Sequence, residues 1–141
     1  MKVIIMNDAV EISKEVAQII IKQINNKHGS VLGFATGASP VETYKRIIEA
    51  YEREEVSLKY ITTFNLDEYV GITRDNDQSY YYFMHHHLFD HVDINEANVN
   101  IPNTGGNLQD ECMDYERRIR EAGGVDLQIV GIGNNGHIGF N

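Results

Sequence analysis

Short apolar runs and amphipathic segments alternate along the chain, and this alternation constrains the fold more than any other feature of the sequence. The runs at residues 3–6, 31–35, 60–66 and 127–130 have the length and residue types of buried strands. Segments with helical periodicity separate them, and strands that alternate with helices favour a parallel sheet with right-handed crossovers. The sequence therefore predicts an α/β fold, with a doubly wound, mostly parallel, Rossmann-like sheet and helices on both faces.

Four helices are expected, and three of them carry clear start signals. Ser39 stands in the position of an N-cap, with Pro40 as the first helical residue. Ser79 and Asn107 are the expected N-caps of the third and fourth helices, and a short strand is expected at residues 99–101. The expected buried stripes are Val16, Ile19, Ile20 and Ile24 on the first helix and Leu108, Cys112, Tyr115 and Ile119 on the last.

Length and charge narrow the function classes. The chain has 141 residues, 42% of them hydrophobic, which suits a single globular domain. Its apolar runs are too short to cross a membrane, its N-terminus lacks a signal peptide, and its single cysteine suits a reducing compartment, so we expect a cytoplasmic protein. A net charge of −9 without a basic stripe disfavours nucleic acid as a partner.

Three predicted strand ends converge on one edge of the sheet, and the first of them has the features of an anion site. Thr36, Gly37, Ala38 and Ser39 form a turn of small residues between a strand and a helix. Backbone amides in such a turn, together with the helix N-terminus, attract anions. A simple helix cap is the alternative, and the absence of a Walker lysine disfavours a nucleoside triphosphate.

The second strand end carries two adjacent acids, Asp67 and Glu68. Because successive residues of an extended backbone point to opposite sides, at most one of them is expected to face a cleft. Either can act as a general base, since partial burial raises the pKa of a carboxyl group toward the working pH. Surface charges that end a strand are the alternative.

The third strand end is a glycine-rich segment with a histidine. Gly131, Gly133 and Gly136 match G-x-G-x-x-G, but a dinucleotide site also needs a following helix and an acidic residue about 20 positions later. His137 follows the last glycine directly and is expected to face the cleft, where an imidazole can move protons near neutral pH. A structural or capping histidine is the alternative.

Neither a metal nor a cofactor is expected. His85, His86 and His87 are consecutive in a predicted helix, so they cannot share one face, and no neighbouring Cys, Asp or Glu has the spacing of a known zinc site. We expect solvated histidine side chains there. The aromatic residues at 80–83 are expected to pack the same helix against the sheet.

Three blocks of the sequence, taken together, resemble the glucosamine-6-phosphate deaminase family. They are residues 32–40 (LGFATGASP), 64–71 (FNLDEYVG) and 131–141 (GIGNNGHIGFN), in matching order and spacing. The resemblance implies the fold of the deaminases and sugar-phosphate isomerases, and a cofactor-free conversion of glucosamine 6-phosphate and water to fructose 6-phosphate and ammonia. Lactonases and isomerases of the same fold share the phosphate turn but are not expected to pair these Asp67 and His137 blocks.

The resemblance also implies roles for individual residues. Asp67 matches the base that takes the proton from C2 and returns it at C1, and His137 matches the histidine that opens the sugar ring. Asn135 stands where many members carry an aspartate that orients this histidine, and an amide can hold the ring tautomer but cannot stabilise an imidazolium electrostatically. The residues expected to contact the substrate and its phosphate are Thr36, Gly37, Ala38, Ser39 and Glu68.

The resemblance covers roughly the N-terminal half of full-length members. In the family, Glu-Pro follows the position of Asn141, and the phosphate-binding Arg and Lys lie further on. We therefore expect residues 1–141 to be a single α/β domain, the N-terminal portion of a longer catalytic domain, truncated at its C-terminal side and inactive alone. A non-catalytic sugar-phosphate binding or regulatory module and a nucleotide-binding half-domain are the alternatives, and a homo-oligomer remains open.

Overall fold

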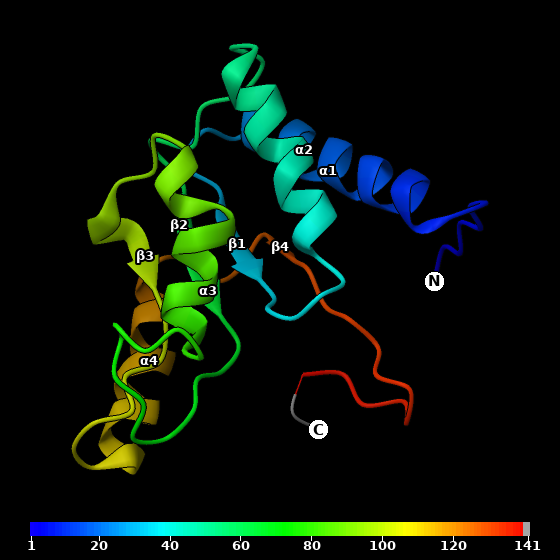
Figure 1. Ribbon diagram of the computed structural model, residues 1–141. Coiled ribbons are helices and arrows are strands. Elements are labelled where there is room, and N and C mark those ends of the chain that lie inside the picture. The colour runs from blue at the N-terminus through cyan, green and yellow to red at the C-terminus, as the bar shows by residue number, and fades with distance from the viewer. Residues whose placement is uncertain (140–141) are drawn as a thin grey trace.

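A four-stranded parallel sheet forms the centre of the computed structural model, which describes residues 1–139 (Figure 1). The strands are β1 (Val31–Phe34), β2 (Thr62–Asn65), β3 (Val99–Asn100) and β4 (Leu127–Gln128). Their order is β3-β2-β1-β4, and each adjacent pair is parallel. The chain passes from β1 through β2 to β3 toward one edge and then returns to the other side of β1 with β4, so the prediction of a doubly wound α/β sheet is confirmed.

The four predicted helices are present, with two short 3-10 turns between α3 and β3. They are α1 (Ala9–Asn26), α2 (Val41–Glu52), α3 (Tyr80–His87) and α4 (Leu108–Glu121), and the turns are η1 (Phe89–His91) and η2 (Glu96–Asn98). The Ser79 hydroxyl accepts the Tyr82 N–H at 2.9 Å, and Asn107 caps α4 in the same way, as predicted.

Helices cover both faces of the sheet (Figure 1). Phe34 of β1 packs edge-on against Tyr44 of α2, with ring centroids 5.6 Å apart, while Phe64 of β2 packs against Tyr115 of α4 at 5.5 Å. Since Gly33 lies beside Phe64 in the register, Phe34 and Phe64 point to opposite faces. The fully buried core lies on the Phe34 face, where α1, α2 and α3 contribute residues such as Ile24, Tyr44 and Met84.

One predicted strand and one position of a predicted helix stripe are wrong. Residues 3–6 form no strand, and Val3 and Ile5 are 70% and 91% exposed, because none of the described strands lies beside them to pair their backbone groups. On α1 the buried positions are Ser13, Ala17, Ile20 and Ile24, whereas Ile19 is exposed. A residue next to Ile20 lies about 100° around the helix, beyond the edge of this stripe.

Two residue predictions are also corrected. Pro40, not Ser39, is the N-cap of α2, and no side chain caps that end of the helix, so Ser39 is left exposed beside it. Cys112 was expected to pack, but it is exposed, and α4 has no fully buried residue. The strand nearest this end of the sheet, β3, is only two residues long and offers α4 little surface to cover.

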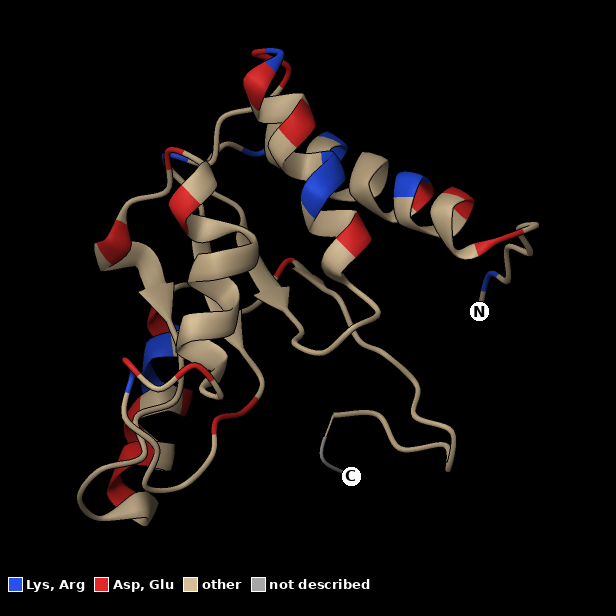
Figure 2. Ribbon diagram, in the orientation of Figure 1, with Lys and Arg blue, Asp and Glu red and all other residues tan. Residues whose placement is uncertain are grey.

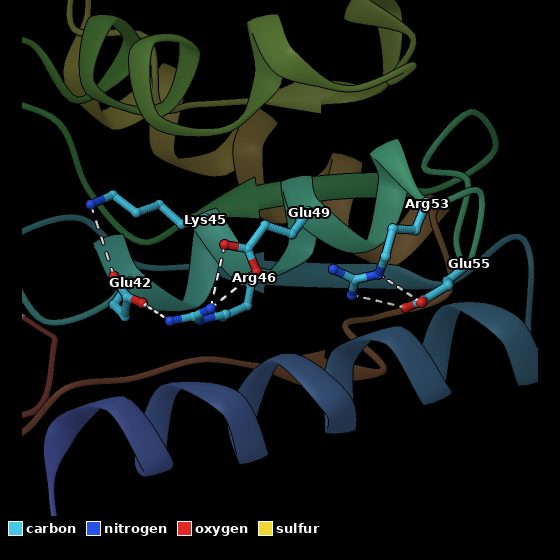
Figure 3. A network of polar contacts seen from close by, with 6 residues as sticks. All are labelled: Glu42, Lys45, Arg46, Glu49, Arg53 and Glu55. Atoms are coloured by element: carbon cyan, nitrogen blue, oxygen red, sulfur yellow. Dashed lines mark hydrogen bonds and ion pairs between the residues drawn. The ribbon is translucent and has the colours of Figure 1, made fainter.

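Charged residues occur along α1, α2 and α4 (Figure 2). On α2, the guanidinium of Arg46 bridges Glu42 and Glu49 at 2.5 and 3.1 Å, and just after the helix Arg53 pairs with Glu55 at 2.7 Å (Figure 3). The Arg46 contacts are partly buried, whereas the pair of Arg53 and Glu55 is exposed and therefore contributes little to stability. The N-terminus of α2 leads to the site described next. None of the helices in residues 1–139 is both long and apolar enough to span a membrane.

Candidate active site

A pocket of about 380 Å³ lies at the carboxyl ends of β1, β2 and β4. Its walls come from the turn after β1, from the residue pair Leu66 and Asp67 after β2, and from the glycine-rich segment after β4. Ligands of open parallel sheets bind at such a position. The predicted convergence of the three strand ends is therefore confirmed.

The turn after β1 supplies Thr36, Gly37, Ala38 and Ser39 to the pocket wall. Gly37 has a φ of 97°, a left-handed conformation that glycine adopts without strain. The turn leads directly into α2, whose N-terminus has no side-chain cap. The backbone amides of the turn and the positive end of the α2 dipole can therefore attract an anion in the pocket.

Asp67 and Glu68 diverge at the end of β2, as the sequence predicts. Asp67 lines the pocket, and its partial burial, together with the adjacent negative charge of Glu68, raises the pKa of its carboxyl group. Glu68 does not line the pocket. Its carboxylate instead accepts hydrogen bonds from the backbone N–H groups of Tyr80 and Tyr81, both at 3.0 Å, at the start of α3.

The segment after β4 folds into a narrow loop that presents His137. Ile132 and Ile138 form an isolated antiparallel bridge, and the Gly133 N–H donates to the His137 carbonyl at 2.9 Å. The imidazole ring lies directly over Gly133, where a Cβ would collide with its atoms. The glycine at position 133 therefore allows the backbone to lie close to the His137 ring, and this contact explains the glycine without a bound dinucleotide phosphate.

Asn135 fixes the orientation of the histidine. The His137 Nδ1 lies 2.5 Å from the Asn135 side-chain oxygen, which can only accept a hydrogen bond. The proton is therefore on Nδ1, and Nε2 carries the lone pair that can accept a proton. Most residues of this loop are exposed to solvent, Asn135 and His137 among them. Phe140 and Asn141, the last residues of the third block, lie outside the described residues.

Tyr80 is a pocket residue that the sequence analysis missed, because it was assigned only to helix packing. It is the first residue of α3 and lines the pocket together with Asp67. Its hydroxyl donates to the Tyr69 hydroxyl at 3.1 Å, and burial, with this hydrogen bond, raises the pKa of Tyr80 to about 12. Tyr80 therefore stays a neutral hydroxyl at physiological pH. Ile12, Ser13 and Val16 of α1 complete the wall near α2.

Asp67 is the only residue with a full charge among those that line the pocket. Figure 2 shows no charged side chain in the segment after β4. Within residues 1–139, positive potential for an anion comes from the turn amides and the α2 dipole rather than from Lys or Arg in the pocket wall.

The histidine triplet lies away from this pocket. His85 is not a freely solvated side chain as expected: it is only 17% exposed, with its Nδ1 2.7 Å from Asp90 and its ring against Tyr81. The reason is the tight turn at η1, which brings Asp90 back toward α3. Among the described residues, no group of three or more His, Cys, Asp and Glu side chains could hold a metal ion.

Residues 7–139 match the family model described as glucosamine-6-phosphate isomerases/6-phosphogluconolactonase. The chain is 53% identical to a protein named glucosamine-6-phosphate deaminase from a Thermoanaerobacter species and 51% identical to one of the same name from Clostridium botulinum strain Loch Maree. All of this chain is covered, but only 56% and 58% of those relatives. The chain thus spans little more than half the length of the curated relatives it matches.

Solved structures show the same fold. A monomeric glucosamine-6-phosphate deaminase superposes with a TM-score of 0.96 at 40% identity, covering 99% of this chain and 58% of that one. A 6-phosphogluconolactonase from Thermotoga maritima gives a TM-score of 0.76 at 26% identity, covering 95% of this chain and 60% of that one. The likeness to the deaminase is the closer of the two in both fold and sequence.

Proposed function

Since the chain belongs to the family of glucosamine-6-phosphate isomerases and 6-phosphogluconolactonases, we propose that it carries the proton-transfer residues of a glucosamine-6-phosphate deaminase. The reaction converts glucosamine 6-phosphate and water to fructose 6-phosphate and ammonia. The observation that carries the proposal is the meeting of Asp67, His137 and the residue 36–39 turn in one pocket. Relatives that are 51–53% identical bear the same name.

The phosphate of the substrate binds at the N-terminus of α2 in this proposal. Thr36, Gly37, Ala38 and Ser39 provide backbone amides and two hydroxyl groups there, and no side chain competes for the end of the helix. This site orients the sugar so that its anomeric end extends toward the segment after β4.

His137 opens the sugar ring. Its Nε2 accepts the proton of the anomeric hydroxyl and returns a proton to the ring oxygen as the bond between C1 and that oxygen breaks. Asn135 keeps the other ring nitrogen protonated, so that Nε2 has its lone pair directed away from the amide. The product of this step is the open-chain aldehyde.

Asp67 then moves a proton along the carbon chain. Its carboxylate takes the proton from C2, next to the aldehyde, while the aldehyde oxygen gains a proton from the ammonium group of the substrate, and an enolamine forms. Return of that proton to C1 leaves an imine at C2, and addition of water to the imine releases ammonia and the ketone of fructose 6-phosphate. The raised pKa of Asp67 makes it a stronger base than an exposed aspartate.

We also propose that residues 1–141 act as one α/β domain within a longer hydrolase of the cytoplasm. The coverage of 56–58% of the curated relatives and the single cysteine support this proposal. Reading the gene beyond the codon of Asn141 tests the first part. An in-frame continuation that begins with Glu-Pro is expected, and a stop codon at that point would contradict it.

A sugar-phosphate binding or regulatory module is the second candidate. It is favoured by the pocket wall, in which residues 1–139 place no Lys or Arg. An assay of fructose 6-phosphate and ammonia formation separates the two, carried out on the 141-residue chain and on the whole gene product that contains it. Turnover by the whole gene product and none by the 141-residue chain is expected. Binding of glucosamine 6-phosphate without turnover by either would favour the binding module.

A further inference from the structure

The Glu68 carboxylate makes three hydrogen bonds to backbone N–H groups at one junction of the fold. One oxygen accepts from Tyr69 at 2.9 Å and from Tyr80 at 3.0 Å, and the other accepts from Tyr81 at 3.0 Å. The first N–H groups of a helix have no partner within the helix. Together with Ser79, which accepts the Tyr82 N–H, Glu68 completes the N-terminal cap of α3.

This cap joins two parts of the pocket wall. Glu68 follows Asp67 directly in the chain, and its carboxylate holds the first residue of α3, Tyr80. Asp67 and Tyr80 both line the pocket, and both are half-buried. The segment between them, residues 69–79, contains turns but no helix or strand.

We propose that Glu68 is a positioning residue of this pocket, which ties the Asp67 loop to α3 and holds the Asp67 carboxylate in place relative to the Tyr80 hydroxyl. The proposal rests on the deaminase function proposed above, in which Asp67 is the base. It assigns Glu68 a role through Asp67 and Tyr80 rather than a contact with the sugar or its phosphate.

Two observations favour this role over a contact with the phosphate. Both carboxylate oxygens already accept backbone N–H groups, and the side chain does not line the pocket. Its negative charge would also repel a phosphate. The two helix ends therefore differ: α3 has its N-terminus neutralised by Glu68, whereas α2 has no side-chain cap and faces the pocket.

Glu68→Gln tests the proposal, with Asp93→Asn as the matched control. The glutamine amide keeps the shape of the side chain, but its nitrogen cannot accept a hydrogen bond from Tyr81. Asp93 likewise accepts a backbone N–H, that of Leu58 at 2.7 Å, and a hydroxyl, that of Ser57 at 2.6 Å, outside the pocket. Both variants are made in the whole gene product.

In Glu68→Gln we expect kcat to fall about 10- to 100-fold, as a small misplacement of a catalytic group does, with KM changed less than about twofold. Asp93→Asn should leave both constants near those of the unmodified protein. A rise in KM at unchanged kcat in Glu68→Gln would assign Glu68 to substrate binding and overturn the proposal.

Amide hydrogen exchange gives a second readout that does not depend on the reaction. In Glu68→Gln, exchange of the Tyr80 and Tyr81 amides should be at least about tenfold faster, since each loses or weakens its acceptor. Unchanged exchange at both amides would overturn the proposal even if kcat falls. If the unmodified protein shows no deaminase turnover, the proposed function fails, and the exchange experiment still decides whether Glu68 holds α3.

Discussion

The hydroxyl of Tyr44 makes two hydrogen bonds to the backbone of Ala35, accepting its N–H at 3.2 Å and donating to its carbonyl oxygen at 2.5 Å. Tyr44 is fully buried in α2, and Ala35 is the residue at which β1 passes into the phosphate turn. A single side chain thus fixes the start of the turn against the helix that follows it. Burial raises the pKa of this phenol, so it remains a donor at any physiological pH.

Removing this hydroxyl should weaken both the fold and the turn. Tyr44→Phe leaves two backbone groups without their partner, at a cost of about 1–3 kcal/mol in the free energy of unfolding. We expect a lower midpoint in urea denaturation and a raised KM for glucosamine 6-phosphate with a smaller change in kcat. Tyr51→Phe, on the same helix but outside the pocket, is the control. Equal KM values in Tyr44→Phe and the unmodified protein would show that the turn does not depend on this contact.

Replacing Asp67 should separate binding from chemistry. Asp67→Asn in the whole gene product is expected to bind glucosamine 6-phosphate but to lose at least about 10²-fold in turnover, because the amide cannot take the proton from C2. Incubation in deuterium oxide measures the step directly by incorporation at the exchanging carbons. Deuterium exchange at the normal rate would rule out Asp67 as the base.

The same substitution should not destabilise the protein. Since the folded-state pKa of Asp67 is raised, the fold favours the protonated form, so stability falls as the pH rises from the unfolded-state pKa to the folded-state pKa and the loss is complete above the latter. Near neutral pH, Asp67→Asn should therefore melt at the same temperature as the unmodified protein or higher, as measured by circular dichroism. A clearly lower melting temperature would indicate that the ionised carboxylate has a stabilising partner.

The acidic limb of the pH–rate profile should report Asp67. The ionised carboxylate is the active form, so kcat/KM rises with pH through a pKa above that of an ordinary aspartate, first because of burial and second because of the charge on Glu68. Glu68→Gln removes that charge and should move the limb to lower pH. The hydroxyl of Tyr80 stays neutral across this range, because burial raises its pKa to about 12. If the acidic limb of the profile lies at the same pH in Glu68→Gln, a group other than Asp67 controls kcat/KM there.

Gly133 should tolerate no side chain, in contrast to its neighbour Gly131. An alanine Cβ at position 133 would occupy the space of the His137 ring, whereas at position 131 it meets no atom within 4 Å. We expect Gly133→Ala to lower kcat about 10-fold or more by displacing the imidazole, and Gly131→Ala to have little effect. Similar rates for the two variants would show that His137 does not need its present position.

The fold could be predicted largely from periodicity, while its exceptions depend on partners distant in the sequence. The strands at β1 and β2 and all four helices follow from apolar runs and caps such as Ser79. The apolar run at residues 3–6 is misleading because a strand is stable only beside another strand, and a local pattern does not indicate whether one is present. Ser39 has the residue type of an N-cap, but the chain enters α2 one residue later, at Pro40.

The site could be predicted as a meeting of three strand ends, and the pocket confirms that meeting for Thr36, Asp67 and His137. The catalytic roles of these residues remain predictions. The placement of Glu68 could not be foreseen, because the backbone amides that donate to its carboxylate lie 12 and 13 residues further along the chain. Tyr80 was missed for a related reason: its position in the pocket depends on the angle at which α3 leaves the loop.

The short edge strand β4 links the edge of the sheet to the position of the His137 loop. Among residues 1–139 it pairs only with β1, so its other side carries unpaired backbone groups, and it leads within a few residues into the His137 loop. Any strand added to that side would lie against the same loop. The position of the His137 loop would then depend on the strand that pairs with the free side of β4 as well as on β1.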